Sequence, residues 1–103
     1  MSDLDKVIHQ PVRLRIVAAL AALDKKEQID FKTLAKMHQL TDGNLGAHLV
    51  KLEEAGYIRV NKGFENRKPR TQVSLTASGR KAFAAHVKAL KAILDGNLGS
   101  GKD

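Results

Sequence analysis

The sequence has no cysteine and no tryptophan, and it contains only one tyrosine and three phenylalanines among its 103 residues. Without cysteine the chain has no disulfide, no thiolate metal site and no cysteine nucleophile. No apolar run approaches the roughly 20 residues that a membrane-spanning helix requires. The acidic opening, Met1 to Asp5, lacks the basic and apolar segments of a secretory signal. We therefore expect a cytoplasmic protein with no membrane partner.

Recognisable catalytic patterns are missing as well. The sequence contains no phosphate-cradling glycine loop, and neither a pair of carboxylates nor a nucleophile with a nearby base stands out. The four histidines, His9, His38, His48 and His86, do not have a recognised metal-ligand spacing. We therefore expect no enzyme activity, no metal and no cofactor.

Positive charge is in excess, and the excess is confined to two segments. The formal net charge is +7. Residues 59–71 contain five basic residues and one acid, and residues 78–91 contain four basic residues and no acid. A localised basic stretch is typical of polyanion binding, although the same pattern also fits a solvated surface that only keeps the protein soluble.

The first half of the chain predicts a helix-turn-helix. Pro11 suits the first turn of a helix that runs to Leu23, and this helix has two apolar faces. A short strand at 29–31 and a short helix at 32–38 follow. The turn 39–41 leads into a longer helix that ends near 55, before Gly56. Thr41 is expected to cap this longer helix. A short helix, a tight turn and a longer helix form the helix-turn-helix pattern.

The second half predicts a basic hairpin and a last helix. Alternating residues at 57–61 and 71–75 predict two strands, joined by a long charged tip at 62–70. The last helix is expected from Ala77 to about Leu94, followed by a flexible tail at 95–103 that contains three glycines. The predicted fold is α+β and mostly helical. It is a winged helix-turn-helix domain over residues 1–94, with a three-helix core, a β-hairpin wing and a C-terminal dimerisation helix.

Three stretches resemble the small winged-helix DNA-binding family allied to the MarR and ArsR transcriptional regulators. They are residues 9–16, residues 40–58, and the wing with its exit between 62 and 80. The resemblance covers most of residues 5–94 and implies a dimeric regulator that reads duplex DNA. The sequence departs from the family at Gly46 and Ala47, where a serine and a larger polar residue are common, so two potential DNA contacts are missing.

The helix at about 42–55 is the expected recognition helix. The 100° spacing places Gly43, Asn44, Ala47 and Lys51 on its outward face, which would enter the major groove. Asn44 can pair with adenine, Ala47 can touch a thymine methyl, and Gly43 allows close approach. Thr41 and Lys51 suit phosphate contacts. An exposed asparagine near a helix start is also a common capping or solvated residue.

The wing at 62–71 is expected to lie along the DNA backbone or in the minor groove. Its cations Arg67, Lys68 and Arg70 would supply the contacts, because a narrow minor groove has a strong negative potential that attracts arginine. The alternative interpretation is a mobile, solvated loop.

A homodimer is expected, because one such module covers too few base pairs to compete with a genome of non-specific sites. The apolar spacing of the last helix resembles a coiled-coil seam, and the second apolar face of the first helix could complete the interface. The candidate interface residues are Leu14, Val17, Phe83, Val87, Leu90 and Leu94. The alternative is that the last helix folds back on its own domain.

The sequence thus predicts a sequence-selective regulator of transcription that binds double-stranded DNA as a homodimer. No sensor region and no small-molecule effector are evident, so any signal is expected to act at the dimer interface, through a partner or through the protein's concentration. The alternative function is a winged-helix module for protein interaction or RNA binding without sequence-specific DNA readout. An uncharged or acidic outward helix and wing would indicate that alternative.

Overall fold

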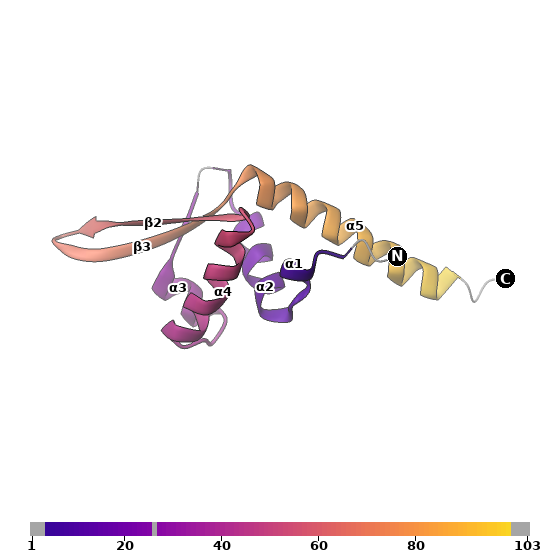
Figure 1. Ribbon diagram of the computed structural model, residues 1–103, viewed down its shortest axis with the longest axis horizontal. Helices are drawn as coiled ribbons and strands as arrows, with labels where there is room; N and C mark the ends of the chain where they lie inside the picture. Colours follow the sequence, from indigo (N-terminus) through magenta and orange to yellow (C-terminus); the bar gives the residue numbers. More distant parts are fainter. Residues whose placement is uncertain (1–3, 26, 100–103) are drawn as a thin grey trace.

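The computed structural model describes residues 4–25 and 27–99 (Figure 1). Its elements are α1 (Lys6–His9), α2 (Pro11–Ala21), β1 (Ile29–Asp30), α3 (Phe31–Met37), α4 (Asp42–Glu54), β2 (Ile58–Glu65), β3 (Lys68–Leu75) and α5 (Ala77–Gly99). Helices α1 to α4 form the body, the β2–β3 hairpin projects to one side, and α5 extends to the other. The molecule is therefore elongated, with principal extents of 64 × 25 × 21 Å.

The predicted winged helix-turn-helix is confirmed. Helices α3 and α4 are separated by a short turn in which Gln39 has a positive φ of 54°. The Thr41 hydroxyl accepts a hydrogen bond from the Asn44 backbone N–H at 3.1 Å, so Thr41 caps α4 as expected. Gly56, with a φ of 80°, follows the end of α4 and turns the chain into β2.

One hydrophobic core joins helices α2, α3 and α4 to the sheet. Its members are spaced three or four residues apart on α2 and α4, which is the spacing of one helix face. The buried residues are Ile16, Val17, Leu20, Leu34, Ala35, Leu45, Leu49, Leu52, Ile58, Val73 and Leu75. Truncating a buried leucine to alanine in such a core typically costs about 2–5 kcal/mol. This core fixes the inward side of α4 and so determines which side faces outward.

The wing is a longer and tighter hairpin than the sequence predicted. The sheet is antiparallel with strand order β1-β3-β2, and β2 and β3 pair without interruption from Ile58 opposite Leu75 to Glu65 opposite Lys68. Only Asn66 and Arg67 lie in the turn, with φ values of 52° and 66°. Two central residues with positive φ match the tight turn favoured by twisted hairpins. The prediction of a long charged loop at 62–70 was therefore wrong.

Pro69 lies inside β3, opposite Phe64, where a proline would usually interrupt a sheet. Cross-strand pairs alternate between hydrogen-bonded and non-bonded, and Glu65 and Lys68 flank the two-residue turn as a bonded pair. Phe64 and Pro69 therefore form a non-bonded pair, so no ladder bond to β2 is lost. Because β1 pairs only with Val73 and Gln72, the other edge of β3 is free at Pro69.

Helix α5 is longer than predicted. It continues to Gly99, so residues 95–99 are helical, and the expectation of a tail from 95 was wrong for these residues. A glycine such as Gly96 weakens a helix interior by about 1 kcal/mol relative to alanine, but it does not end the helix. The expected looseness of Met1–Asp3, and of the chain beyond 99, falls outside the described residues. Among the helices described, none combines the length and apolarity required to cross a bilayer.

The short helix α1 had no sequence prediction. The Asp5 carboxylate caps it by accepting hydrogen bonds from the backbone N–H groups of Val7, at 2.8 Å, and Ile8, at 3.1 Å. Ile8 is fully buried. Asp5 also accepts a hydrogen bond from the Tyr57 hydroxyl, and its backbone N–H donates to His86 Nδ1 at 3.2 Å. This contact ties the N-terminal segment to the end of the helix-turn-helix and to α5.

Candidate nucleic-acid interface

The outward face of α4 is exposed as the sequence predicted. Thr41, Gly43, Asn44, Ala47 and Lys51 are all exposed, while the leucines of the opposite side lie in the core. The Asn44 side chain makes no hydrogen bond to any other described residue, so both its oxygen and its NH₂ group are free. The structure thus brings these five residues together on one surface.

An ion pair at the start of α4 was not found from the sequence. The Asp42 carboxylate pairs with the ammonium group of Lys32, near the start of α3. The two side chains are 55% and 72% exposed, so the pair contributes little to stability. The pair instead changes the local electrostatics, because Lys32 compensates the negative charge of Asp42 beside the outward-facing residues of α4.

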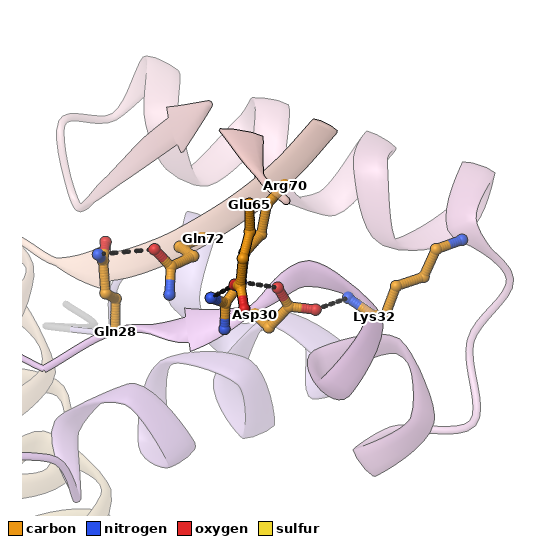
Figure 2. A network of polar contacts seen from close by, with 6 residues as sticks. All are labelled: Gln28, Asp30, Lys32, Glu65, Arg70 and Gln72. Atoms are coloured by element: carbon orange, nitrogen blue, oxygen red, sulfur yellow. Dashed lines mark hydrogen bonds and ion pairs between the residues drawn. The ribbon is translucent and has the colours of Figure 1, made fainter. Parts of the chain in front are cut away.

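The cations of the wing fall into two groups. Arg67 lies in the turn and Lys68 next to it, and both are exposed with no ion pair to another described residue. Arg70, in contrast, donates from Nε to Asp30 at 3.0 Å and also pairs with Glu65 (Figure 2). The charge of Arg70 is therefore compensated within the chain. The prediction that groups Arg70 with the free wing cations needs this correction.

Polar contacts fasten the base of the wing to β1. Gln28 donates from its amide to Gln72 at 3.0 Å and accepts from the Asn61 amide at 2.8 Å. The second oxygen of Asp30 caps α3 by accepting from the Lys32 backbone N–H at 3.2 Å (Figure 2). Together with the Arg70 pair, these contacts hold the hairpin in one direction relative to the body. We call this set of contacts the wing brace; its residues are Gln28, Asp30, Asn61, Glu65, Arg70 and Gln72.

A shallow cavity of about 270 Å³ lies between α4 and the wing. Its lining comes from α3, α4 and both wing strands: Phe31, Gly46, Leu49, Val50, Glu53, Val60, Lys62 and Thr71. A side chain at Gly46 would meet nothing within 4 Å, so the glycine leaves this space open. We call this space the wing groove.

The second basic segment has a partly structural role. The Arg80 guanidinium donates to the backbone oxygens of Ala21 at 3.0 Å and Leu23 at 3.5 Å, at the end of α2. It therefore satisfies carbonyl groups that a helix end leaves without partners. Lys81, Lys88 and Lys91 are exposed on α5, which leads away from the wing in Figure 1.

The predicted dimer residues differ in exposure. Val17 is 0% exposed within the core, so its side chain cannot contact a second subunit, and its assignment to the interface was wrong. Phe83 packs against the core of its own chain. Leu14, Val87 and Leu90 are half-buried, whereas Leu94 is 59% exposed. The first part of α5 thus packs on its own domain, and its later part presents apolar side chains to solvent.

The surroundings of two histidines near these surfaces lower their pKa values. Burial lowers the pKa of His48, and the positive charge of Arg13, whose guanidinium lies 3.4 Å from His48 Nδ1, lowers it further. Burial also lowers the pKa of His86, whose ring centroid lies 5.4 Å from that of His9. Within the described residues, no three side chains of the usual metal-binding types come together.

A helix-turn-helix with an exposed second helix, followed by an antiparallel hairpin, defines the winged-helix class of protein. The chain belongs to the winged helix DNA-binding domain family, whose model matches residues 12–94. This match confirms the resemblance found in the sequence.

The chain is also similar to individual proteins from other organisms. The chain is 37% identical to uncharacterized protein MJ0432 of Methanocaldococcus jannaschii over 82 residues, which are 80% of this chain and 86% of that one. It is 33% identical to a transcriptional regulator homologue from Pyrococcus horikoshii OT3, with a TM-score of 0.79 over 87% of this chain and 86% of that one.

A more distant structure has the same fold. It is the homodimeric winged helix-turn-helix DNA-binding domain Mb0332 of Mycobacterium bovis, a possible ArsR-family regulator. That domain is 18% identical, with a TM-score of 0.68 over 87% of this chain and 77% of that one.

Proposed function

We propose that the protein is a homodimeric transcriptional regulator that binds double-stranded DNA with sequence selectivity. The observation that carries this proposal is the pairing of charges on one side of the molecule. Asp42 is paired with Lys32, and Asp30 and Glu65 share the charge of Arg70, whereas the cations Arg67 and Lys68 have no ion pair to another described residue. The surface made by α4 and the wing is therefore available to a polyanion.

In this proposal the start of α4 enters the major groove, which is wide enough to accept a helix. The side-chain amide of Asn44 is free to form two hydrogen bonds with one adenine. Its NH₂ group donates to N7, and its oxygen accepts from the N6 amino group. The Thr41 oxygen already accepts from the backbone of Asn44, so its hydrogen is free to donate to a phosphate. Lys51 adds a second phosphate contact, and Ala47 and Gly43 allow the helix to approach the bases closely.

The wing groove suits the DNA backbone. A single phosphodiester strand separates a major groove from the adjacent minor groove. If α4 occupies the first groove and the wing tip the second, that strand passes over the wing groove, where Lys62 and Thr71 can contact its phosphates. Arg67 and Lys68 then lie at the entrance to the minor groove, where the potential is most negative.

Dimerisation through α5 would place two recognition helices on one duplex. The Mycobacterium bovis domain is homodimeric, which supports a homodimer for the present chain. The apolar residues offered for the contact are Leu14, Val87, Leu90, Ile93 and Leu94. Two-fold pairing doubles the DNA contact and fixes the spacing of the two half-sites.

Selection of bound sequences from a random pool of duplexes tests the proposal. We expect enrichment of a two-fold symmetric site that binds at least about 10³-fold more tightly than random duplex at the same salt concentration. An RNA hairpin pool of matched length is the control for the RNA-binding alternative. Equal binding to all duplexes, or preferential enrichment of RNA, would contradict the proposal.

A further inference from the structure

Phe64 is the most exposed large apolar side chain among the described residues. Its exposed fraction is 79%, compared with 59% for Leu94, 52% for Met37 and 51% for Val50. It lies in β2, two residues before the turn, at the far end of the wing. A phenylalanine in this position has no role in the core, so its apolar surface is available to a partner.

The strand register shows which side of the wing Phe64 occupies. Alternate residues of a strand share a face, so Phe64 lies with Lys62 and Val60. Pro69 and Thr71 lie opposite Phe64 and Lys62 on β3 and belong to the same face. Val60, Lys62 and Thr71 also line the wing groove beside α4. The Phe64 ring therefore lies on the same face of the hairpin as the wing groove, but closer to the wing tip.

The surroundings of Phe64 are positively charged. Lys62 lies on the same face, and Arg67 and Lys68 lie at and beside the turn. The nearest acid, Glu65, is paired with Arg70. A partner that matches this tip has negative charge on its rim and flat apolar surface inside. The minor groove of DNA offers this chemistry when one base step opens, because two rows of phosphates border bases whose stacked faces are apolar.

Three features of the hairpin restrict its motion. The turn has only two residues, Pro69 restricts the strand opposite Phe64, and the wing brace fastens the hairpin to β1. A side chain that separates two stacked base pairs must be presented rigidly, because a mobile hairpin would lose conformational entropy on insertion.

From these observations we propose that Phe64 is a wedge that inserts between two base pairs in the minor groove next to the site contacted by α4. This inference rests on the proposed DNA-binding function. Insertion partly unstacks one base step and bends the duplex toward the major groove. Pyrimidine–purine steps such as TA and CA unstack most easily, so the wedge selects for such a step without any hydrogen bond to a base.

Bending of the selected duplex tests the wedge. The end-to-end distance is measured by fluorescence energy transfer between dyes at the two ends, and unstacking is followed by 2-aminopurine placed at the expected step. With the wild-type protein we expect a bend of about 20–90° and a rise in 2-aminopurine fluorescence. We also expect a preference for TA or CA over GC-only steps at that position.

Phe64→Ala is expected to bind about tenfold more weakly and to lose the bend, the fluorescence rise and the step preference. Its salt dependence should stay that of the wild type, because no charge is removed. Phe64→Leu keeps an apolar wedge and should retain part of the bend. Met37→Ala, which removes an apolar side chain from α3 away from the wing, is the matched control and should behave as the wild type.

The outcomes separate this inference from the function on which it rests. Wild-type protein that binds its selected duplex without bending it, or a Phe64→Ala variant that bends it equally, would overturn the wedge alone. Wild-type protein without preference for any duplex would overturn both proposals. Because Phe64 is exposed, Phe64→Ala should unfold at the wild-type temperature, and that melting curve confirms that the variant is folded.

Discussion

At the scale of single residues, the proposed interface of α4 and the wing contains side chains suited to two different roles. The Asn44 side chain is unbonded to other described residues and carries both a donor and an acceptor, which is what base recognition needs. Lys51 and the wing residue Arg67 carry only positive charge, which matches phosphates of any sequence. Specificity and overall affinity should therefore respond to different substitutions.

We expect Asn44→Ala to reduce the ratio of selected to random duplex affinity by about tenfold, because a bidentate base contact is worth roughly 1–3 kcal/mol. Its affinity for random duplex should hardly change. Arg67→Ala should weaken binding to both duplexes equally and reduce the slope of log K against log salt by about 0.9. Fluorescence anisotropy titrations at several salt concentrations measure all of these quantities.

A control for the loss of charge is Lys88→Ala, which removes one cation from α5, the helix that leads away from the wing. Its salt slope should equal that of the wild type. If Asn44→Ala and Arg67→Ala both leave DNA binding unchanged, the docking geometry proposed above is wrong.

Another residue-scale prediction concerns pH. Burial lowers the pKa of His86 below its usual 6.5, and the charge of His9 lowers it further, against a smaller opposing effect of Asp5. The folded state therefore binds fewer protons near pH 6.5 than the unfolded chain does. The contribution of His86 to the free energy of unfolding is present above pH 6.5 and is lost as the pH falls through and below that value.

Urea denaturation at pH 7.5, 6.5 and 5.5 measures this effect. The wild type should lose stability over this range, and His86→Gln, which cannot take up a proton, should show a smaller loss. The pKa values of His38 and His48 are also lowered, so part of the loss should remain in the variant. An equal pH dependence in the two proteins would show that His86 is not the titrating group.

The hydrogen bond between Tyr57 and Asp5 has a separate pH window. It raises the pKa of Tyr57 to about 12. Burial would raise the pKa of Asp5, but the hydrogen bond from Tyr57 and those from Ile8 and Val7 outweigh it, so the pKa falls below 3.8. Asp5 therefore contributes stability above pH 3.8 that is lost as the pH falls below that value, outside the range in which His86 acts.

At the scale of secondary-structure elements, Asp30 connects α3 to the wing. One of its oxygens caps α3 and the other accepts from Arg70. Asp30→Ala should destabilise the protein by about 1 kcal/mol through the lost cap. Asp30→Asn keeps a capping oxygen, so its stability loss should be smaller, although it removes the charge that faces Arg70.

Both substitutions weaken the wing brace and should speed amide hydrogen exchange in residues 62–71. Exchange in α4 should stay unchanged in Asp30→Asn. Chemical denaturation together with residue-resolved hydrogen exchange checks the two effects. Unchanged exchange of the hairpin in both variants would mean that the Arg70 pair does not hold the wing.

Much of the element order could be predicted from the sequence, because the core-facing residues repeat at helical spacing and the ends are marked by Thr41 and Gly56. The hairpin was predicted too short, because Asn66 and Arg67 do not form one of the common glycine-containing turns. The end of α5 was placed too early, because a glycine weakens a helix without being obliged to end it.

The site could be predicted in part. Exposure of Asn44 and Lys51 follows from the helix period, and the structure agrees with it. The compensation of Arg70 by Asp30 could not be found, because the partners are 40 residues apart and come together only when β1 joins the sheet. Burial of Val17 was missed for a similar reason, since periodicity shows that a face is apolar but not what covers it.

At the scale of the whole molecule, the wing and the C-terminal part of α5 lie at opposite ends of an elongated molecule (Figure 1). Leu94 and Ile93 are 59% and 43% exposed there, and self-association would cover them. We expect sedimentation at micromolar concentration to give twice the chain mass of 11.3 kDa. Leu94→Glu should give the monomer with an unchanged circular dichroism spectrum, because Leu94 is outside the core.

Lys88→Glu is the control for the dimer, because it also introduces a glutamate but on the opposite side of α5, and its charge change of −2 exceeds the −1 of Leu94→Glu. This variant should remain dimeric. A wild-type protein that sediments as a single chain would exclude the dimer. The exposed apolar residues of α5 would then have to be covered by a different partner.

The strand order also determines how these molecules behave when they are crowded together. Strand β2 lies at the border of the sheet, so the backbone groups along its outer side have no neighbouring strand in the described part of the chain. Such a border can add strands from other molecules and start aggregation. Arg59 and Lys62 lie along it, and their positive charges would oppose the approach of a second copy. Concentrated salt screens that repulsion, so we expect the same high salt concentrations that weaken the proposed DNA binding also to favour aggregation of the protein.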